Sequence, residues 1–299
     1  MTATLTAASP RDEVPAVAKA RFTVRQFAVL PMLVLYAALL AYPMGLIAVR
    51  AFTSSDTGEW TLANFSRLVT EPVTGIVVLD TLRVAGVTTL FCLVLGYVVS
   101  YTIARMPRWG SFLEGLVLIP LMTSVLVRAF VWIALLEDRG VVNTLLMTLG
   151  ITQEPIQLVY NETGVLIGMV HVMLPLTIIP MLAVFRQIDQ RLLRASDSLG
   201  ASPWTTFWRV YLPLSLPGVI AGGLLCFVLS LGFYVTPAML GGGQTMLLAQ
   251  QIEVQVQRLL QLNQASALSL SLILLVLVAW ALVAIARIAR RATRKGEEA

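Results

Sequence analysis

Six stretches of mostly apolar residues, each long enough to cross a bilayer, constrain this chain more than any other feature. The hydrocarbon core of a bilayer is about 30 Å thick and a helix rises about 1.5 Å per residue, so about 20 apolar residues span it. Polar or Gly/Pro-containing segments separate the stretches. They are Phe27–Val49, Thr81–Ala104, Phe112–Leu136, Thr163–Phe185, Leu214–Tyr234 and Ala265–Ala286. The sequence therefore predicts an all-α membrane protein with six transmembrane helices.

The composition agrees with a lipid environment. The chain is 58% hydrophobic and 12% charged, whereas soluble domains carry about 25% charged residues. We expect one membrane domain over 27–286, an N-terminal tail over 1–26 and a basic C-terminal tail over 287–299. The first apolar run follows a long polar segment and no small-residue cleavage pattern comes after it, so we interpret 1–26 as a tail and not as a cleaved signal.

The distribution of Lys and Arg predicts the orientation. With the N-terminus inside, fifteen of the 21 basic residues lie on the inner side, which follows the positive-inside rule. Both termini are then expected in the cytoplasm, and the net charge of +5 needs no nucleic acid to explain it. The inner residues are Arg11, Lys19, Arg21, Arg25, Arg105, Arg108, Arg186, Arg191, Arg194, Arg209, Arg287, Arg290, Arg291, Arg294 and Lys295.

Side chains that bind metals or catalyse reactions are scarce. The two cysteines, Cys92 and Cys226, both fall inside apolar spans and are expected to be packed core thiols. With a single histidine, His171, and no central Asp or Glu in any span, the sequence predicts neither a metal site nor an enzyme. No G-x-x-x-x-G-K-[ST] phosphate-binding loop occurs, so we expect no cofactor on this chain.

The segment from Asp189 to Gly222 carries the clearest local signals. Asp189–Ser198 is expected to form a short helix, and Gly200 can take the left-handed conformation that ends it. Ser202 is a favoured N-cap and Pro203 a favoured first residue of a second helix, Pro203–Tyr211. That helix is predicted to present three aromatic side chains on its surface. They are Trp204, Phe207 and Trp208.

This segment resembles the coupling loop of the inner-membrane permeases of binding-protein-dependent ABC importers. Their signature is Glu-Ala-Ala, then a Gly, then an apolar residue and Leu-Pro. Two positions depart from it, because Arg194 replaces the Glu and Ser196 the second Ala, which weakens any inherited salt bridge to the ATPase. The matching residues are Ala195, Gly200, Val210, Leu212 and Pro213.

The resemblance implies a type I ABC importer permease fold in which this loop is a cytoplasmic coupling helix. It implies that the loop binds a separate ATP-binding cassette subunit, which carries ATP and Mg. It also implies an inner-membrane location, a second and non-identical permease subunit, and an external substrate-binding protein. The coupling residues that it implies are Arg194, Ala195, Ser196, Gly200, Ala201, Ser202, Pro203, Trp204, Phe207 and Trp208.

A narrower resemblance, over roughly Arg21 to Arg287, is to the spermidine/putrescine subgroup of these permeases. It rests on the segments Ile119–Leu146 and Gly232–Ile252. This resemblance implies a small solute such as a polyamine or an amino-acid-like amine. Because the subgroup also contains permeases for ferric ion and phosphonates, these remain alternative substrates.

Polar and irregular residues inside the spans are candidates for the translocation pathway. Arg128 lies in the third span, where a central charge costs about 2.5–3.5 kcal/mol. It lines the pathway, extends outward to the membrane surface, or pairs with Glu137 or Asp138. His171 precedes Pro175 by one turn and either fills a kink or lines the pathway. Val235-Thr236-Pro237 is expected to interrupt the fifth span, and Gly241–Gly243 to turn the chain. The candidate pathway residues are Arg128, Trp132, His171, Tyr234, Pro237 and Gly242.

The remaining segments lie on the outer side. Thr53–Asp80 and Glu137–Glu162 are either docking surfaces or ordinary loops, and the second is expected to hold a short helix that ends at Gly150. Met246–Leu262 has both helical and strand-like periodicity, and lipid surroundings favour a helix. A secondary transporter, the competing function, would need acidic ion sites or paired discontinuous helices, which the sequence does not show.

Overall fold

The computed structural model describes residues 24–297 except 56 and 107, and side chains over 31–285 with the same two gaps. Its contacts divide the chain into two units, Met1–Leu46 and Ile47–Ala299, which are described separately. The first unit contains most of α1, Val24–Ala51, a helix that includes Pro31 and Pro43. Of the predicted tails, 1–26 and 287–299, residues 1–23 and 298–299 lie outside the described residues, and no side chain of either tail is described.

The second unit is built from helices, because in lipid each backbone N–H and C=O must be bonded within the chain. Within the described residues the only β structure is an isolated bridge, Thr53 to Trp60. The helices are α2 (Ala63–Thr70), α3 (Pro72–Arg105), α4 (Gly110–Leu118), the 3₁₀ helix η1 (Ile119–Met122), α5 (Val125–Leu136), α6 (Val141–Thr148), α7 (Glu162–Phe185), α8 (Gln190–Ser198), α9 (Pro203–Thr206), the π-helix η2 (Phe207–Tyr211), α10 (Leu212–Leu231), α11 (Val235–Leu240), α12 (Leu248–Gln257) and α13 (Leu262–Glu297).

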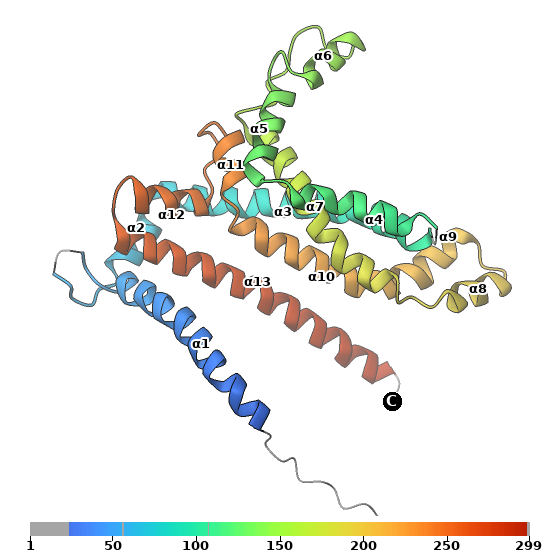
Figure 1. Cartoon of the computed structure of the whole chain (residues 1–299), viewed down its shortest axis with the longest axis horizontal. Helices are drawn as coiled ribbons and strands as arrows, with labels where there is room; N and C mark the ends of the chain where they lie inside the picture. The colour runs from blue at the N-terminus through green and yellow to red at the C-terminus, as the bar shows by residue number, and fades with distance from the viewer. Residues whose placement is uncertain (1–23, 56, 107, 298–299) are drawn as a thin grey trace, which may run out of the picture. The chain divides into compact units, whose positions relative to one another are not determined.

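The core forms where α3, α7 and α10 pack on one another (Figure 1). Gly222 lets α10 approach α7 closely, since a Cβ there would lie 2.7 Å from the carbonyl oxygen of Thr177. Cys92 and Cys226 are fully buried, unpaired thiols that pack with Val172 and Met173, as the sequence predicts. This three-helix core supports both candidate sites described below.

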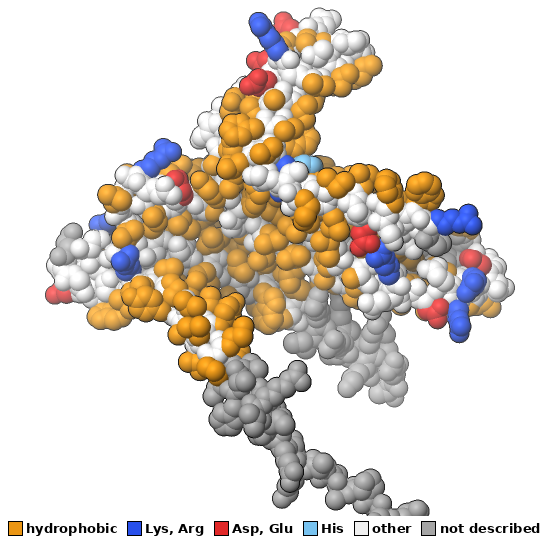
Figure 2. Space-filling model, viewed as in Figure 1, with side chains coloured by type: hydrophobic (Ala, Val, Ile, Leu, Met, Phe, Trp, Pro, Cys, Tyr) orange, Lys and Arg blue, Asp and Glu red, His pale blue; other side chains and the backbone are white. Residues whose placement is uncertain are grey.

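Hydrophobic side chains also cover much of the molecular surface in the view of Figure 2. Leu90 on α3 is 60% exposed and Leu274 on α13 is 62% exposed. Apolar surface on this scale is unusual for a soluble monomer and fits contact with lipid or with other membrane subunits. Five helices in the described residues are long and apolar enough to cross a membrane, and a bent helix pair makes a sixth if it is counted as one span.

That bent pair corrects the prediction for the third span. Phe112–Leu136 is not one straight helix, because Gly110–Met122 and Val125–Thr148 meet at an angle of 95°. The break falls at Thr123 and Ser124, directly after the 3₁₀ turn that contains Pro120. Proline lacks the N–H that a continuous helix needs, so Pro120 weakens the helix here.

Two smaller differences concern helix ends. The helix of the second span begins at Pro72, nine residues before the predicted Thr81, with proline in its first turn where an N–H is not required. The fifth span is interrupted at 232–234 and not at Pro237, which is buried in the first turn of α11. Leu248–Gln257 is helical, and Gly150 has a φ of +70° just after α6, both as predicted.

Candidate functional site

The turn between α8 and α9 has the local structure that its sequence predicts. The Asp189 carboxylate caps α8 by accepting a hydrogen bond from the Arg191 N–H at 2.8 Å. Gly200 has a φ of +81°, and its N–H donates to the Asp197 carbonyl at 3.0 Å, which closes the C-terminus of α8. Ser202 caps α9 by accepting from the Thr205 N–H at 3.2 Å, and Pro203 follows it.

Two hydroxyl groups join α8 to α9. The Ser196 and Thr206 hydroxyl oxygens lie 3.0 Å apart, and Thr206 also donates to the Asp197 carboxylate at 3.4 Å. Thr206 is buried. Ser196, a departure from the family signature, therefore has a structural role that alanine could not fill. The two short helices are held as one rigid corner.

The sequence predicted that the second helix of this corner is separate from the fifth span. The structure shows instead that the two are continuous. α9, η2 and α10 follow one another without a break from Pro203 to Leu231. The wider π-turn at Phe207–Tyr211 lies directly before Pro213, whose missing N–H prevents regular α-helical bonding there. The second helix of the corner and the fifth span therefore form one continuous helical segment.

An aromatic cluster packs beneath the corner and includes one residue that was expected on the surface. Phe207 is half-buried, and its ring lies 6.0 Å from the ring of Tyr97 and 5.8 Å from that of Tyr101, between ring centroids. Tyr211 is 1% exposed and packs against Phe185 at 5.8 Å. The prediction of three exposed aromatic residues was thus wrong for Phe207, because its side chain faces the helices and not the solvent.

This cluster extends the site to residues that sequence reasoning did not assign to it. The Arg105 guanidinium lies over the Tyr101 ring at 4.7 Å and near the Tyr211 ring at 5.7 Å. Tyr97 and Tyr101 lie one turn apart on α3. Their rings contact those of Phe207 and Tyr211, which lie one turn apart on the π-turn. The sequence does show a pair of aromatic residues one turn apart in each of these two segments. It does not show that the two pairs pack against each other.

The outer surface of the corner is apolar. Trp204 is 70% exposed and Leu199 is 88% exposed, while Trp208 is 49% exposed and lies 5.5 Å from Trp204 between ring centroids. We call these three residues the tryptophan surface. Arg194, Ala195 and Gly200 are exposed on α8 and its end, and Ala201 is half-buried. Arg194 has no ion pair among the described residues. The surface offers flat apolar area without a covering element of its own.

A second group of polar side chains lies at the break between η1 and α5. Arg128 is 8% exposed, and its Nη2 donates to the Thr123 carbonyl, left free at the break, at 3.2 Å. Its Nε and Nη1 are buried without hydrogen-bond partners. Among the described residues Arg128 forms no ion pair, so the predicted pairing with Glu137 or Asp138 was wrong.

Trp132 and His171 lie beside this arginine. Trp132 is one turn after Arg128 on α5, and its ring is 5.5 Å from the ring of His171 on α7, between centroids. His171 Nδ1 is buried and has no hydrogen-bond partner. α7 continues through Pro175 as one helix, so His171 does not mark a helix end. The structure therefore brings three of the six candidate pathway residues together.

The other three belong to a neighbouring region. α11 packs on α5 and α7, and it contains the buried Pro237 after the exposed Tyr234. Gly242 has a φ of +57°, as a tight turn requires, but it packs on Tyr160, where a Cβ would lie 2.5 Å from the Tyr160 Cβ. Gly242 is therefore a close-packing position as well as a turn.

Comparison with known families places these sites in context. Residues 92–294 match the family described as the binding-protein-dependent transport system inner membrane component, which is more than half of the chain. The chain belongs to this family. It is accordingly a permease subunit, a transport component and not an enzyme. The match covers α7 to α10 and the corner between them.

Two named relatives extend this result. The permease is 34% identical over 197 residues to the spermidine/putrescine transport system permease protein PotB of Escherichia coli, covering 66% of this chain and 71% of PotB. It is 36% identical over 205 residues to the putative 2-aminoethylphosphonate transport system permease protein PhnU of Salmonella typhimurium, covering 67% and 70%. The resemblance to the spermidine/putrescine-type permeases is confirmed.

The fold agrees with solved structures. A chain of a bacterial ABC transporter involved in the import of the acidic polysaccharide alginate matches with a TM-score of 0.68 at 16% identity, covering 90% of this chain and 95% of that chain. The alginate transporter in complex with an alginate pentasaccharide-bound periplasmic protein matches with a TM-score of 0.71 at 18% identity and the same coverage. The ABC importer permease fold is thereby confirmed.

Proposed function

We propose that this permease forms half of a translocation pathway, with a second permease subunit as the other half. An ATP-binding cassette subunit that carries ATP and Mg²⁺ binds its corner between α8 and α10. The observation that carries the proposal is the tryptophan surface, Leu199, Trp204 and Trp208. It is apolar, exposed and mounted on a corner that Gly200 and Ser202 hold in one conformation. Exposed tryptophans on a rigid support are typical of residues that dominate a protein interface.

The contacts of the corner suggest how a movement of the ATPase would reach the membrane spans. Trp204 and Trp208 would fill a groove of the ATPase, and closure of the ATPase would move α9. Because α9, η2 and α10 are continuous, the motion would reach α10 directly. Phe207 and Tyr211 would carry it sideways through Tyr97 to α3 and through Phe185 to α7. The packed rings make this a stiff connection, since close-packed interiors transmit displacement.

The orientation that we propose puts both termini and the corner in the cytoplasm. The support is the distribution of Lys and Arg along the sequence, with Arg186, Arg191, Arg194 and Arg209 gathered around the corner. The permease then lies in a bacterial-type inner membrane, and an external substrate-binding protein delivers solute to its opposite face.

The solute that we propose is a small amine-bearing compound, either a polyamine or an amino-acid-like molecule. The relatives support this class, because the names of PotB and PhnU both refer to compounds with an amine. Aromatic rings near the break, such as Trp132, offer cation–π contacts to an ammonium group. Ferric ion is the weaker alternative, because no group of three or more His, Cys, Asp or Glu in the described residues could hold a metal.

One observation favours a phosphonate as the second candidate. Arg128 Nε and Nη1 and His171 Nδ1 are buried without partners on facing helices. A phosphonate oxygen would accept hydrogen bonds from the guanidinium, which suits oxyanions geometrically. A polyamine would instead be repelled by it. The two candidates therefore predict opposite roles for Arg128 in solute uptake.

The experiment is ATP-driven uptake into proteoliposomes that contain the complete importer and its binding protein. Labelled spermidine and labelled 2-aminoethylphosphonate are compared, each with the other as unlabelled competitor. ATP-dependent accumulation of spermidine supports the polyamine candidate, and ATP-dependent accumulation of 2-aminoethylphosphonate supports the phosphonate candidate. Accumulation that continues without the ATPase, driven by an ion gradient, would assign the chain to secondary transport and contradict it.

A further inference from the structure

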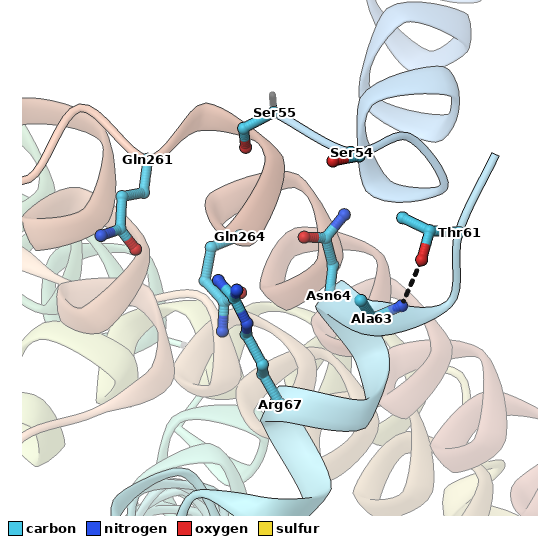
Figure 3. A pocket seen from close by; sticks show the side chains of 8 residues that line it. All are labelled: Ser54, Ser55, Thr61, Ala63, Asn64, Arg67, Gln261 and Gln264. Atoms are coloured by element: carbon cyan, nitrogen blue, oxygen red, sulfur yellow. Dashed lines mark hydrogen bonds between the residues drawn. The ribbon is translucent and has the colours of Figure 1, made fainter. Parts of the chain in front are cut away.

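A polar pocket lies at the end of the permease opposite the corner. It has a volume of about 290 Å³ and is formed where the loop before α2, α2 itself and the start of α13 meet (Figure 3). None of its lining side chains is acidic. They are Ser54, Ser55, Thr61, Ala63, Asn64, Arg67, Gln261 and Gln264.

Hydrogen bonds hold the wall of this pocket in place. The Asn64 amide donates to the carbonyls of Ala51 and Thr53, each at 3.0 Å, and so ties the loop to α2. Asn263 on α13 donates to the same Thr53 carbonyl at 2.7 Å. The bridge between Thr53 and Trp60 closes the loop. The pocket is therefore preformed, which lowers the entropic cost of binding a partner.

Two side chains in the pocket have hydrogen-bonding capacity that the described chain does not use. Gln264 is 5% exposed, and its Oε1 is buried without a partner. Arg67 is exposed and forms no ion pair among the described residues. In Figure 3 both side chains extend into the same space, one from α13 and one from α2. The Gln264 amide can turn about its last side-chain bond, so either its oxygen or its NH₂ can face an occupant.

The chemistry of the lining selects an anionic group. A guanidinium binds a carboxylate by two parallel hydrogen bonds, and rotation of the Gln264 amide would present its NH₂ to the same carboxylate. Gln261 and Thr61 add further polar groups at the rim. A carboxylate would thus meet one positive charge and no negative charge.

The position of the pocket identifies the source of that carboxylate. α3 has 34 residues, so it is about 51 Å long. Its end at Arg105 contacts the aromatic cluster beneath the corner, whereas its start packs on α2. If the corner faces the ATPase, the pocket faces the side from which solute arrives. We propose that this pocket receives an Asp or Glu side chain of the external substrate-binding protein and fixes its docked orientation. The inference rests on the proposed function.

The test measures the affinity of the cognate substrate-binding protein for the complete importer in nanodiscs, with and without Arg67→Glu. Charge reversal places a carboxylate against the incoming one, so the Kd should rise at least tenfold at low ionic strength. Gln264→Leu should raise the Kd several-fold. Arg67→Gln, which keeps most of the side-chain volume, should weaken binding in the same direction if Arg67→Glu fails to assemble.

The matched control is Arg258→Glu, an exposed arginine after α12 that does not line the pocket. It makes the same change in net charge and should alter the Kd less than twofold. An unchanged Kd for Arg67→Glu, or an equal rise for Arg258→Glu, would overturn the inference. If the parent importer binds no substrate-binding protein at all, the proposed function itself fails, which is a separate result.

Discussion

The corner between α8 and α10 and the break between η1 and α5 differ in how their structure is specified. In the corner, every turn has a nearby chemical cause: Gly200 takes a positive φ, Ser202 caps and Pro203 starts a helix. At the break, a mostly apolar run that contains Pro120 bends by 95°, and Arg128 turns inward to a carbonyl. Local residues are sufficient for the first region, whereas the second depends on what its helices pack against.

This contrast bears on function. The proposed coupling requires the corner to keep one shape when the ATPase moves it, and its caps and hydroxyl contacts would hold that shape. The break instead holds a buried guanidinium with two unused donor atoms beside Trp132 and His171. Buried polar atoms without hydrogen-bond partners lower the stability of a protein. They are expected at sites that bind a ligand or change conformation.

The largest effect should come from Gly200→Val, which tests whether the corner is specified locally. A β-branched residue at a φ of +81° costs about 1–2 kcal/mol and would open the turn. Solute-stimulated ATP hydrolysis by the reconstituted importer should fall more than tenfold. Gly200→Asn is the matched control, because asparagine tolerates the left-handed region, and it should keep most of the activity. Equal activity of the two variants would refute local specification.

Arg128→Met should have the next largest effect and tests the break. Removing the donor to Thr123 leaves that carbonyl unsatisfied, which should alter the bend and lower uptake about five- to tenfold. Spin labels at the exposed Leu116 and Val131 report the bend as a distance change. Arg128→Lys, which keeps the charge, separates geometry from electrostatics. If uptake and the label-to-label distance both match those of the parent, Arg128 neither sets the bend nor contributes to transport.

Phe207→Ala and Trp204→Ala should separate the inner face of the corner from the outer face. Loss of the half-buried Phe207 ring should lower the stability of the permease by about 2 kcal/mol, seen as a lower thermal unfolding midpoint in detergent. Trp204→Ala should leave that midpoint within about one degree, because surface substitutions change stability by less than about 0.5 kcal/mol. The opposite pattern would mean that Phe207 faces the partner.

Ser196→Ala should have the smallest effect. A double-mutant cycle with Thr206→Val should give a coupling energy of about 0.5–1.5 kcal/mol from the hydroxyl contact. Stimulated ATP hydrolysis should change by no more than about twofold, because the caps still hold the turn. A coupling energy near zero would show that the two hydroxyls do not join α8 to α9.

How far the sequence predicts this molecule depends on the range of the interactions involved. Spans one, two, four, five and six follow from apolar length alone, and the corner follows from Gly200, Ser202 and Pro203. The inward direction of Phe207 could not be predicted, since it depends on Tyr97 and Tyr101 more than 100 positions earlier in the chain. The bend at Thr123 could not be predicted, because a single Pro120 in an apolar run is compatible with a continuous span. The pocket around Arg67 brings together residues from opposite ends of the chain, which no local pattern indicates.

The proposed coupling depends first on binding of the ATPase to the tryptophan surface. This binding is tested most directly by the affinity of the purified ATPase for the permease in nanodiscs, comparing the parent with the double variant Trp204→Ala/Trp208→Ala. Trp280→Ala, which removes an equally exposed tryptophan on α13, is the control. The account predicts at least a hundredfold rise in Kd for the double variant, because hot-spot residues each cost about 2 kcal/mol or more, and no change for the control. An ATPase that binds the double variant as tightly as the parent would contradict it.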